Sequence, residues 1–279
     1  TTFPVGSARG ATFDPDLELR VGRAMGEEAR ARQANVLLAP TINLLRQPQW
    51  GRAQETYGED TLHVGVMGAA FVRGVQENAI ASVKHFAANT IEDNRFKVDV
   101  EIDERTLREV YLPHFKRAVD AGAGSVMSAY NLVNGEYCSE NRHLLTEILK
   151  EDWGFDGFVE SDWVLALHST APSALAGLDV EMPKPAFYGP KLLDAVDAGE
   201  VPVAAIDDAV RRILRTKFRF GIFDGRPPLD PAIVVESPEH RALALEVARK
   251  AIVLLKNDGG ALPLDRGVLR RIAVVGALA

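Results

Sequence analysis

Side chains that could do chemistry stand at the ends of predicted β-strands. Asp162 follows the apolar run Phe158-Val159, and Lys84-His85 lies near the end of a predicted strand over Ala81–Phe86. A carboxylate can attack an anomeric carbon and form a glycosyl ester, which splits one difficult displacement into two easier ones. Lysine and histidine can hold sugar hydroxyls and help keep a neighbouring carboxylate ionised. The alternatives are that Asp162 caps a helix, that Lys84-His85 is a surface pair, or that Lys84 is the Schiff-base lysine of an aldolase.

Further candidates follow the same pattern. Arg52 and Arg95 lie in polar loops after predicted strands, where each could also be a solvated or loop-bracing residue. Tyr130 ends a predicted strand over Ser125–Tyr130, and Trp163 follows Asp162; each could contact a sugar or only pack. In a parallel barrel the C-terminal tips of the strands converge on one face. The succession of tips therefore predicts one polar pocket around Asp162.

The elements that must position these residues alternate along the chain. Apolar runs over 36–40, 81–86, 125–130, 157–161 and 178–182 predict strands, and helical spacing appears over 17–32, 62–75, 142–152, 191–198, 205–218 and 239–249. Asp103 is expected to cap a helix. Strands separated by helices indicate right-handed βαβ units and a parallel sheet. The visible units are fewer than the eight of a complete barrel.

Composition excludes several classes of protein. The chain has 279 residues, 47% hydrophobic and 25% charged, and a net charge of −7, which argues against a nucleic-acid partner. No apolar run is long enough to span a membrane. Cys138 is the one cysteine, and His63, His114, His143 and His168 lack metal-ligand spacing, so we expect no metal or cofactor. The chain starts at Thr1 rather than Met, which leaves localisation open.

An ordered set of segments resembles glycoside hydrolase family 3, the β-glucosidase group. The matching pieces are Arg46-Gln47-Pro48-Gln49-Trp50-Gly51-Arg52, Glu55 with Gly58-Glu59-Asp60, Val83-Lys84-His85-Phe86, Asn94-Arg95, Val126-Met127-Ser128-Ala129-Tyr130-Asn131, Gly154-Phe155-Asp156-Gly157-Phe158 through Ser161-Asp162-Trp163, Ala176-Gly177-Leu178-Asp179, Glu181-Met182-Pro183 and Val253-Leu254-Leu255-Lys256-Asn257. Each piece is weak by itself, but their order across nearly the whole chain is specific.

The resemblance implies a retaining, exo-acting β-glycosidase that removes terminal β-D-glucosyl residues from a small or oligosaccharide β-glycoside. Asp162 would be the nucleophile, and the sugar subsite would be lined by Arg52, Lys84, His85, Arg95, Tyr130 and Trp163. The loop over 87–95 has no histidine, unlike the N-acetylhexosaminidase branch. A β-xylosidase and a non-catalytic sugar-binding fragment remain alternatives, and a lysine-dependent aldolase is a more distant one.

The resemblance also implies a domain organisation. We expect residues 1–225 to form an α/β catalytic domain, a (β/α)8-type TIM barrel without its first strand. Residues 226–270 would be a linker with a connecting helix and a strand over 252–255, and residues 271–279 the first strand of a truncated C-terminal α/β sandwich domain. That second domain would supply the acid/base glutamate, so this chain alone is expected to be weak or inactive. Glu160, Asp179 and Glu181 are interpreted as structural.

Overall fold

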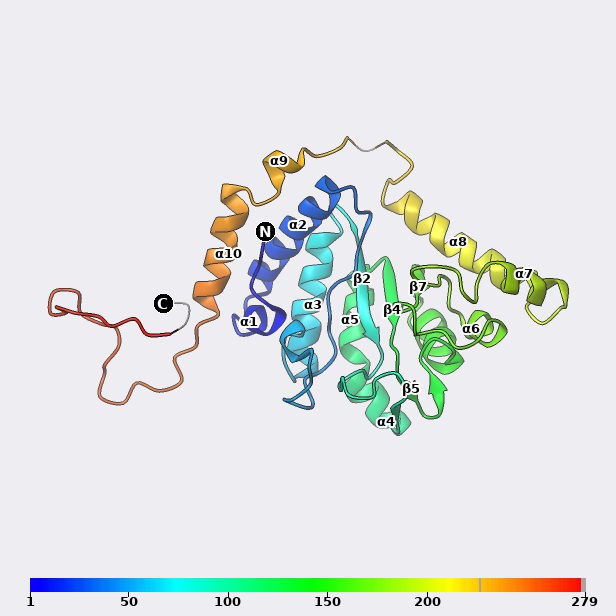
Figure 1. Cartoon of the computed structure of the whole chain (residues 1–279), viewed down its shortest axis with the longest axis horizontal. Coiled ribbons are helices and arrows are strands. Elements are labelled where there is room, and N and C mark those ends of the chain that lie inside the picture. The colour runs from blue at the N-terminus through cyan, green and yellow to red at the C-terminus, as the bar shows by residue number, and fades with distance from the viewer. Residues whose placement is uncertain (226, 277–279) are drawn as a thin grey trace.

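The computed structural model describes residues 1–225 and 227–276 and shows an α/β fold (Figure 1). The strands are β1 Val36–Leu37, β2 Ile80–Phe86, β3 Asp99–Val100, β4 Ser125–Ser128, β5 Leu132–Val133, β6 Glu136–Tyr137 and β7 Phe158–Glu160. The helices are α1 Gly6–Gly10, α2 Pro15–Ala31, η1 Ala53–Glu55, α3 Thr61–Val75, α4 Glu104–Thr106, η2 Leu107–Tyr111, α5 Pro113–Asp120, η3 His143–Asp152, α6 Ala171–Ala176, α7 Pro190–Asp197, α8 Val203–Arg219, α9 Pro231–Val234 and α10 Pro238–Lys250.

The central sheet has four parallel strands in the order β1-β2-β4-β7. Its register pairs Ser82 with Ser125, and Val126 with Val159. Because every strand runs the same way, all C-terminal ends lie at one edge of the sheet. The predicted strand over 178–182 is reduced to a single bridge between Val180 and Glu160. This prediction was wrong in length, because only Val180 has a strand neighbour with which to pair.

The helices that follow the strands begin and end at residues the sequence marks. Asp60 caps α3 through the backbone N–H of His63, and Asp103 caps α4 through that of Thr106, as predicted. Helices α2 and α3 cross in close contact beside β2 (Figure 1). A Cβ at Gly22 would lie 2.4 Å from the Phe71 carbonyl oxygen, so glycine permits this approach.

A buried charged cluster joins the N-terminal helices to the loop that carries Arg52. Glu18 of α2 is 1% exposed, and its Oε1 accepts hydrogen bonds of 2.6 Å from Arg9 Nη1 and the Tyr57 hydroxyl. The Arg9 guanidinium also lies 5.2 Å from the centre of the Phe71 ring. The sequence shows Glu18 only as one polar residue of an amphipathic helix.

A small second sheet was not predicted. Strands β3, β5 and β6 pair in the order β3-β5-β6, and they lie outside the strands predicted for the main sheet. Asn134 binds both the N–H and the C=O of Ile102, which ties the β5–β6 turn to the segment after β3. These strands have two residues each, too short for an alternating pattern to show.

The C-terminal segment corrects two further predictions. Residues 252–255 and 271–276 form no strand, and they project from the body of the molecule with exposed side chains (Figure 1). A strand needs a neighbour to accept and donate its backbone hydrogen bonds, and in the described part of the chain neither segment has one. Residue 226 at the predicted linker boundary, and residues 277–279, lie outside the described residues. The domain division stays a prediction.

Among the described helices, none combines the length and the apolar character that crossing a bilayer requires.

Candidate active site

Asp162 stands just beyond β7, at the edge where the parallel strands end. It is 7% exposed, and its Oδ1 accepts a 2.7 Å hydrogen bond from the backbone N–H of Trp163. Its Oδ2 lies 3.6 Å from Nε2 of His85 and has no hydrogen-bond partner among the described residues. One oxygen is thus held in place while the other is left available.

The groups around Asp162 favour its charged form, whereas burial disfavours that form. Burial raises the pKa of this carboxyl above its ordinary value, while the Trp163 N–H, the Tyr130 hydroxyl and the positive charges of Lys84 and Arg52 lower that pKa. The net direction is upward. The Asp162 carboxyl is therefore poorly solvated and lies among groups that favour its charged form.

Arg52 precedes η1 and is held beside the site by Glu55 and His85. Its Nε and Nη2 donate to the two carboxylate oxygens of Glu55, both at 2.6 Å, and its Nη1 lies 3.0 Å from Nε2 of His85. Thr41 donates to the same Glu55 carboxylate at 3.1 Å. The paired hydrogen bonds fix the plane of the guanidinium.

Lys84 extends from β2 beside the same carboxylates. Burial lowers the pKa of Lys84, and the charge of Arg52 lowers it further, whereas Glu55, Asp162 and Glu160 act in the opposite direction. The pKa of His85 lies well below its ordinary value because of burial and the surrounding cations. His85 is therefore neutral at physiological pH.

Aromatic side chains complete the site. The Tyr130 hydroxyl donates to the carbonyl of Trp163 at 2.8 Å, and burial raises the pKa of Tyr130 to about 12. The Arg95 guanidinium lies 4.8 Å from the ring centres of both Tyr130 and Phe96, and it pairs with Glu92. Trp163 is 37% exposed. The structure thus brings together all seven residues that the sequence singled out.

The other carboxylates near Asp162 are occupied. Glu160 accepts a hydrogen bond from Ser82, and burial raises its pKa to about 7. Asp179 binds Lys150 Nζ at 2.8 Å and the Val159 N–H at 2.7 Å, and Glu181 accepts from the backbone N–H groups of residues 186–188. These contacts agree with the structural interpretation of Asp179 and Glu181.

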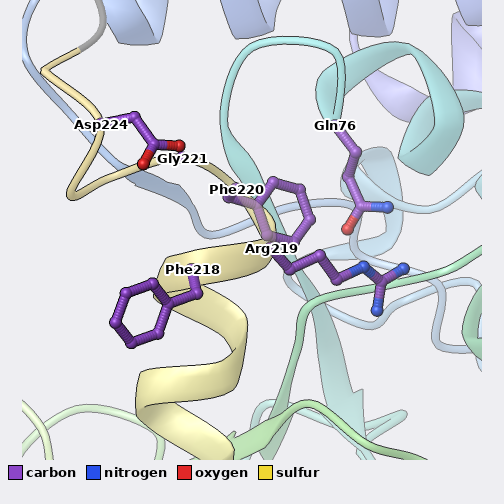
Figure 2. A pocket seen from close by; sticks show the side chains of 6 residues that line it. All are labelled: Gln76, Phe218, Arg219, Phe220, Gly221 and Asp224. Carbon is purple, nitrogen blue, oxygen red and sulfur yellow. The ribbon is translucent and has the colours of Figure 1, made fainter.

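A cavity of about 450 Å³ lies at the opposite end of the sheet (Figure 2). Figure 2 shows Gln76 and Arg219 side by side on one wall, and both donate to the carbonyl of Gly122, just before β4 begins. These polar groups are used to join α8 to the N-terminal ends of the strands. In a parallel barrel this face is the stability face, so the cavity is separate from the candidate site.

Several residues of the site were missed by sequence reasoning. Asn43 binds the backbone of His85, Glu55 holds Arg52, and Trp50 Nε1 donates to Glu92 at 3.1 Å. Trp50 and Glu55 belong to segments quoted for the family resemblance, but no function was inferred for them. No group of three His, Cys, Asp or Glu residues in the described ranges could hold a metal ion.

Comparison with known proteins decides the family. The sequence model of the Glycosyl hydrolase family 3 N terminal domain matches residues 1–216. The chain belongs to glycosyl hydrolase family 3. It is 47% identical over 277 residues to a beta-glucosidase of Rhizobium radiobacter, covering 98% of this chain and 34% of the relative. It is 41% identical over 280 residues to thermostable beta-glucosidase B of Acetivibrio thermocellus, covering 99% of this chain and 36% of the relative.

Solved structures agree. Beta-glucosidase 3B from Thermotoga neapolitana in complex with glucose superposes with a TM-score of 0.89 at 39% identity, covering 95% of this chain and 38% of that one. The α/β fold of the TIM-barrel type predicted from the sequence is thereby confirmed. This family 3 chain spans about a third of the length of the relatives named here.

Proposed function

We propose that this family 3 domain belongs to a retaining, exo-acting β-glycosidase that removes terminal β-D-glucosyl residues, with Asp162 as the nucleophile. The observation that carries the proposal is the Asp162 carboxylate. One of its oxygens is held by the Trp163 N–H, and the other is buried without a partner in the described chain. An unpartnered buried carboxylate oxygen is costly for the fold, and a strand tip is where a barrel enzyme would use it.

The surrounding residues supply the sugar site. Arg52, Lys84 and Arg95 provide donors and positive charge, His85 and Tyr130 are at the nucleophile, and Trp163 offers an exposed indole face. Charged donors near the nucleophile keep it ionised and can bind sugar hydroxyls in fixed positions. A solved relative, beta-glucosidase 3B, is described as a complex with glucose, which supports a glucose-sized glycone.

The second carboxyl of the reaction comes from outside these 279 residues. A retaining enzyme needs an acid/base carboxyl about 5–5.5 Å from the nucleophile. Asp179 and Glu181 are held by structural contacts, and the chain matches only about a third of its relatives' length. In the first step Asp162 attacks the anomeric carbon while that acid protonates the leaving oxygen; water then cleaves the ester, with the same group acting as base.

Labelling of the full-length protein tests this assignment. A 2-deoxy-2-fluoro-β-glucoside with a good leaving group is expected to form a stable ester on Asp162, detected by mass spectrometry of the labelled peptide. The corresponding xyloside, run in parallel, distinguishes a xylosidase by its faster labelling. Borohydride trapping of an aldehyde or ketone substrate at Lys84, without any ester at Asp162, would favour an aldolase. If neither Asp162 nor Lys84 is labelled, the glycosidase proposal is refuted.

Replacing Tyr130 with Phe is expected to shift the pH dependence. The Tyr130 hydroxyl lowers the pKa of Asp162, so its removal raises that pKa, and a larger fraction of Asp162 is protonated at acidic pH. The acidic limb of kcat/KM should therefore move to higher pH. A loss of up to about tenfold is expected at the optimum, because the hydroxyl also holds the Trp163 carbonyl and a typical hydrogen bond contributes about 0.5–1.5 kcal/mol. The measurement is a pH–rate profile of the full-length protein.

Tyr188 provides the matched control. Its hydroxyl also donates to a backbone carbonyl, that of Leu178, at 3.0 Å, but Asp162 is not among the groups that affect its pKa. Tyr188→Phe removes the same atom and should leave the acidic limb in place. Equal shifts in both variants would show that Tyr130 has no particular relation to Asp162.

A further inference from the structure

Asn43 is bound to the backbone of His85 at a point where the β1–β2 ladder ends. The chain after β1 continues parallel to β2, since Lys84 N–H donates to Pro40 O and Ile42 N–H donates to Lys84 O. At the next residue, the side chain of Asn43 makes the hydrogen bonds to the backbone of β2. Its Oδ1 accepts from the His85 N–H at 2.9 Å, and its Nδ2 donates to the His85 carbonyl at 2.8 Å.

These two contacts leave one orientation for the amide. A backbone N–H only donates and a carbonyl only accepts, so the end of the Asn43 amide that faces the N–H must be oxygen. The same oxygen lies 3.1 Å from Nδ1 of the His85 ring. An amide oxygen only accepts, and Nδ1 must therefore carry the proton.

The other side of the ring requires the same tautomer. His85 is 1% exposed and neutral, so a proton on Nδ1 leaves a lone pair on Nε2. Arg52 Nη1, which can only donate, lies 3.0 Å from that nitrogen. A proton on Nε2 would set two donors against each other.

We propose that Asn43 is a positioning residue that holds His85 in the Nδ1–H tautomer, so that Nε2 accepts a hydrogen bond from Arg52 and does not donate to Asp162. Arg52 is then held at three of its nitrogens, by the two oxygens of Glu55 and by His85. Asp162 Oδ2, 3.6 Å from Nε2, keeps its lone pairs for the substrate. This consequence for catalysis rests on the proposed function, whereas the tautomer does not.

The tautomer can be measured in the unmutated chain. In a ¹⁵N-labelled sample, long-range ¹H–¹⁵N correlation spectra distinguish a protonated ring nitrogen from one that carries a lone pair. We expect His85 to show a protonated Nδ1 and a lone-pair Nε2 across neutral pH. His85→Gln identifies the signals, because they disappear in that variant. A protonated Nε2 in His85 would overturn the proposal.

Asn43→Asp tests the role of Asn43 itself. The carboxylate places an oxygen against the His85 carbonyl and adds a buried negative charge, which favours a ring protonated on both nitrogens. Nε2 should then lose its lone-pair signal, and kcat/KM of the full-length protein should fall by about 10–100-fold, the usual cost of removing a group that orients a histidine. Because Arg52 is a binding residue in this proposal, KM should rise along with the fall in kcat.

Asn134→Asp is the matched control. Asn134 also binds one residue, Ile102, through its N–H at 2.9 Å and its C=O at 2.9 Å, but it is exposed and has no histidine beside it. The same chemical change there should leave the His85 signals and kcat/KM unchanged.

The outcomes separate the two proposals. If Asn43→Asp does not fold, the neutral variant Asn43→Ser replaces it, with the expected result that both tautomers of His85 appear. A folded Asn43 variant that retains the single Nδ1–H tautomer would overturn the role of Asn43. Failure to label Asp162 would instead refute the glycosidase proposal, whatever tautomer the histidine shows.

Discussion

Asp162→Asn in the full-length protein is expected to lower kcat by about 10⁴-fold or more, as does the loss of a nucleophile in enzymes whose residues act as a unit. Asparagine keeps the shape of the side chain, and its Oδ1 can still accept the hydrogen bond from the Trp163 N–H. The amide cannot form the glycosyl ester, so the covalent route is closed. Hydrolysis of an aryl β-glucoside measures the loss, and calorimetric binding of glucose should show that the sugar site remains.

Asp156→Asn is the control for this substitution. It changes the same chemical group in the same segment, but Asp156 is exposed and pairs with Arg219 at the opposite end of the sheet. Its activity should be that of the unmutated protein. Addition of azide to Asp162→Gly with an activated substrate should restore turnover and yield an α-glycosyl azide, because azide enters from the side the carboxylate occupied. Retained activity in Asp162→Asn would contradict the proposed role.

Asp162→Asn should be more stable than the unmutated protein at neutral pH. The folded-state pKa of Asp162 is raised above its unfolded value, mainly by burial. Such a group contributes stability below the unfolded pKa and loses that contribution as pH rises through the folded pKa. At pH 7 the contribution is gone, and a neutral asparagine avoids the cost. A higher Tm with lost activity is the expected signature of a residue kept for function.

Glu18→Ala is expected to reduce the free energy of unfolding by about 3–5 kcal/mol, the usual cost of leaving a buried charge without its partner. Glu18 is the acceptor for both Arg9 and the Tyr57 hydroxyl, and the Arg9 side chain is only 12% exposed. The cluster ties α1 and α2 to the segment that carries Arg52. Urea unfolding, extrapolated linearly to water, measures the change.

Two variants sharpen this test. Glu77→Ala removes an equally close partner, 2.6 Å from Arg23, but that pair is 46% and 45% exposed and should contribute less than about 1 kcal/mol. The double variant Arg9→Met/Glu18→Leu removes both charges and should recover most of the loss, since apolar replacement of a buried pair is often neutral. A loss in Glu18→Ala no larger than that in Glu77→Ala would show that burial does not decide the effect.

The amino-acid sequence alone determined where the four strands of the main sheet and the long helices lie. It also determined which side chains stand at the ends of those strands. Asp162, Lys84, His85 and Tyr130 could be placed together because parallel strands have their C-terminal ends on one edge. Local capping signals also sufficed, as at Asp103. All these features depend on residues close together in the chain, and the family resemblance added the retaining mechanism and the assignment of the surrounding residues to a sugar subsite.

Only the tertiary structure decided which groups hold these side chains. Asn43 and His85 are 42 residues apart, and Glu18 and Tyr57 are 39 residues apart, so neither pair leaves a local pattern in the sequence. The segments over 252–255 and 271–276 have the composition of strands, but no neighbouring strand pairs with them in the described residues. A strand needs a neighbouring strand, and a buried charge needs a buried partner. Tertiary packing decides whether either is present, and local propensity does not.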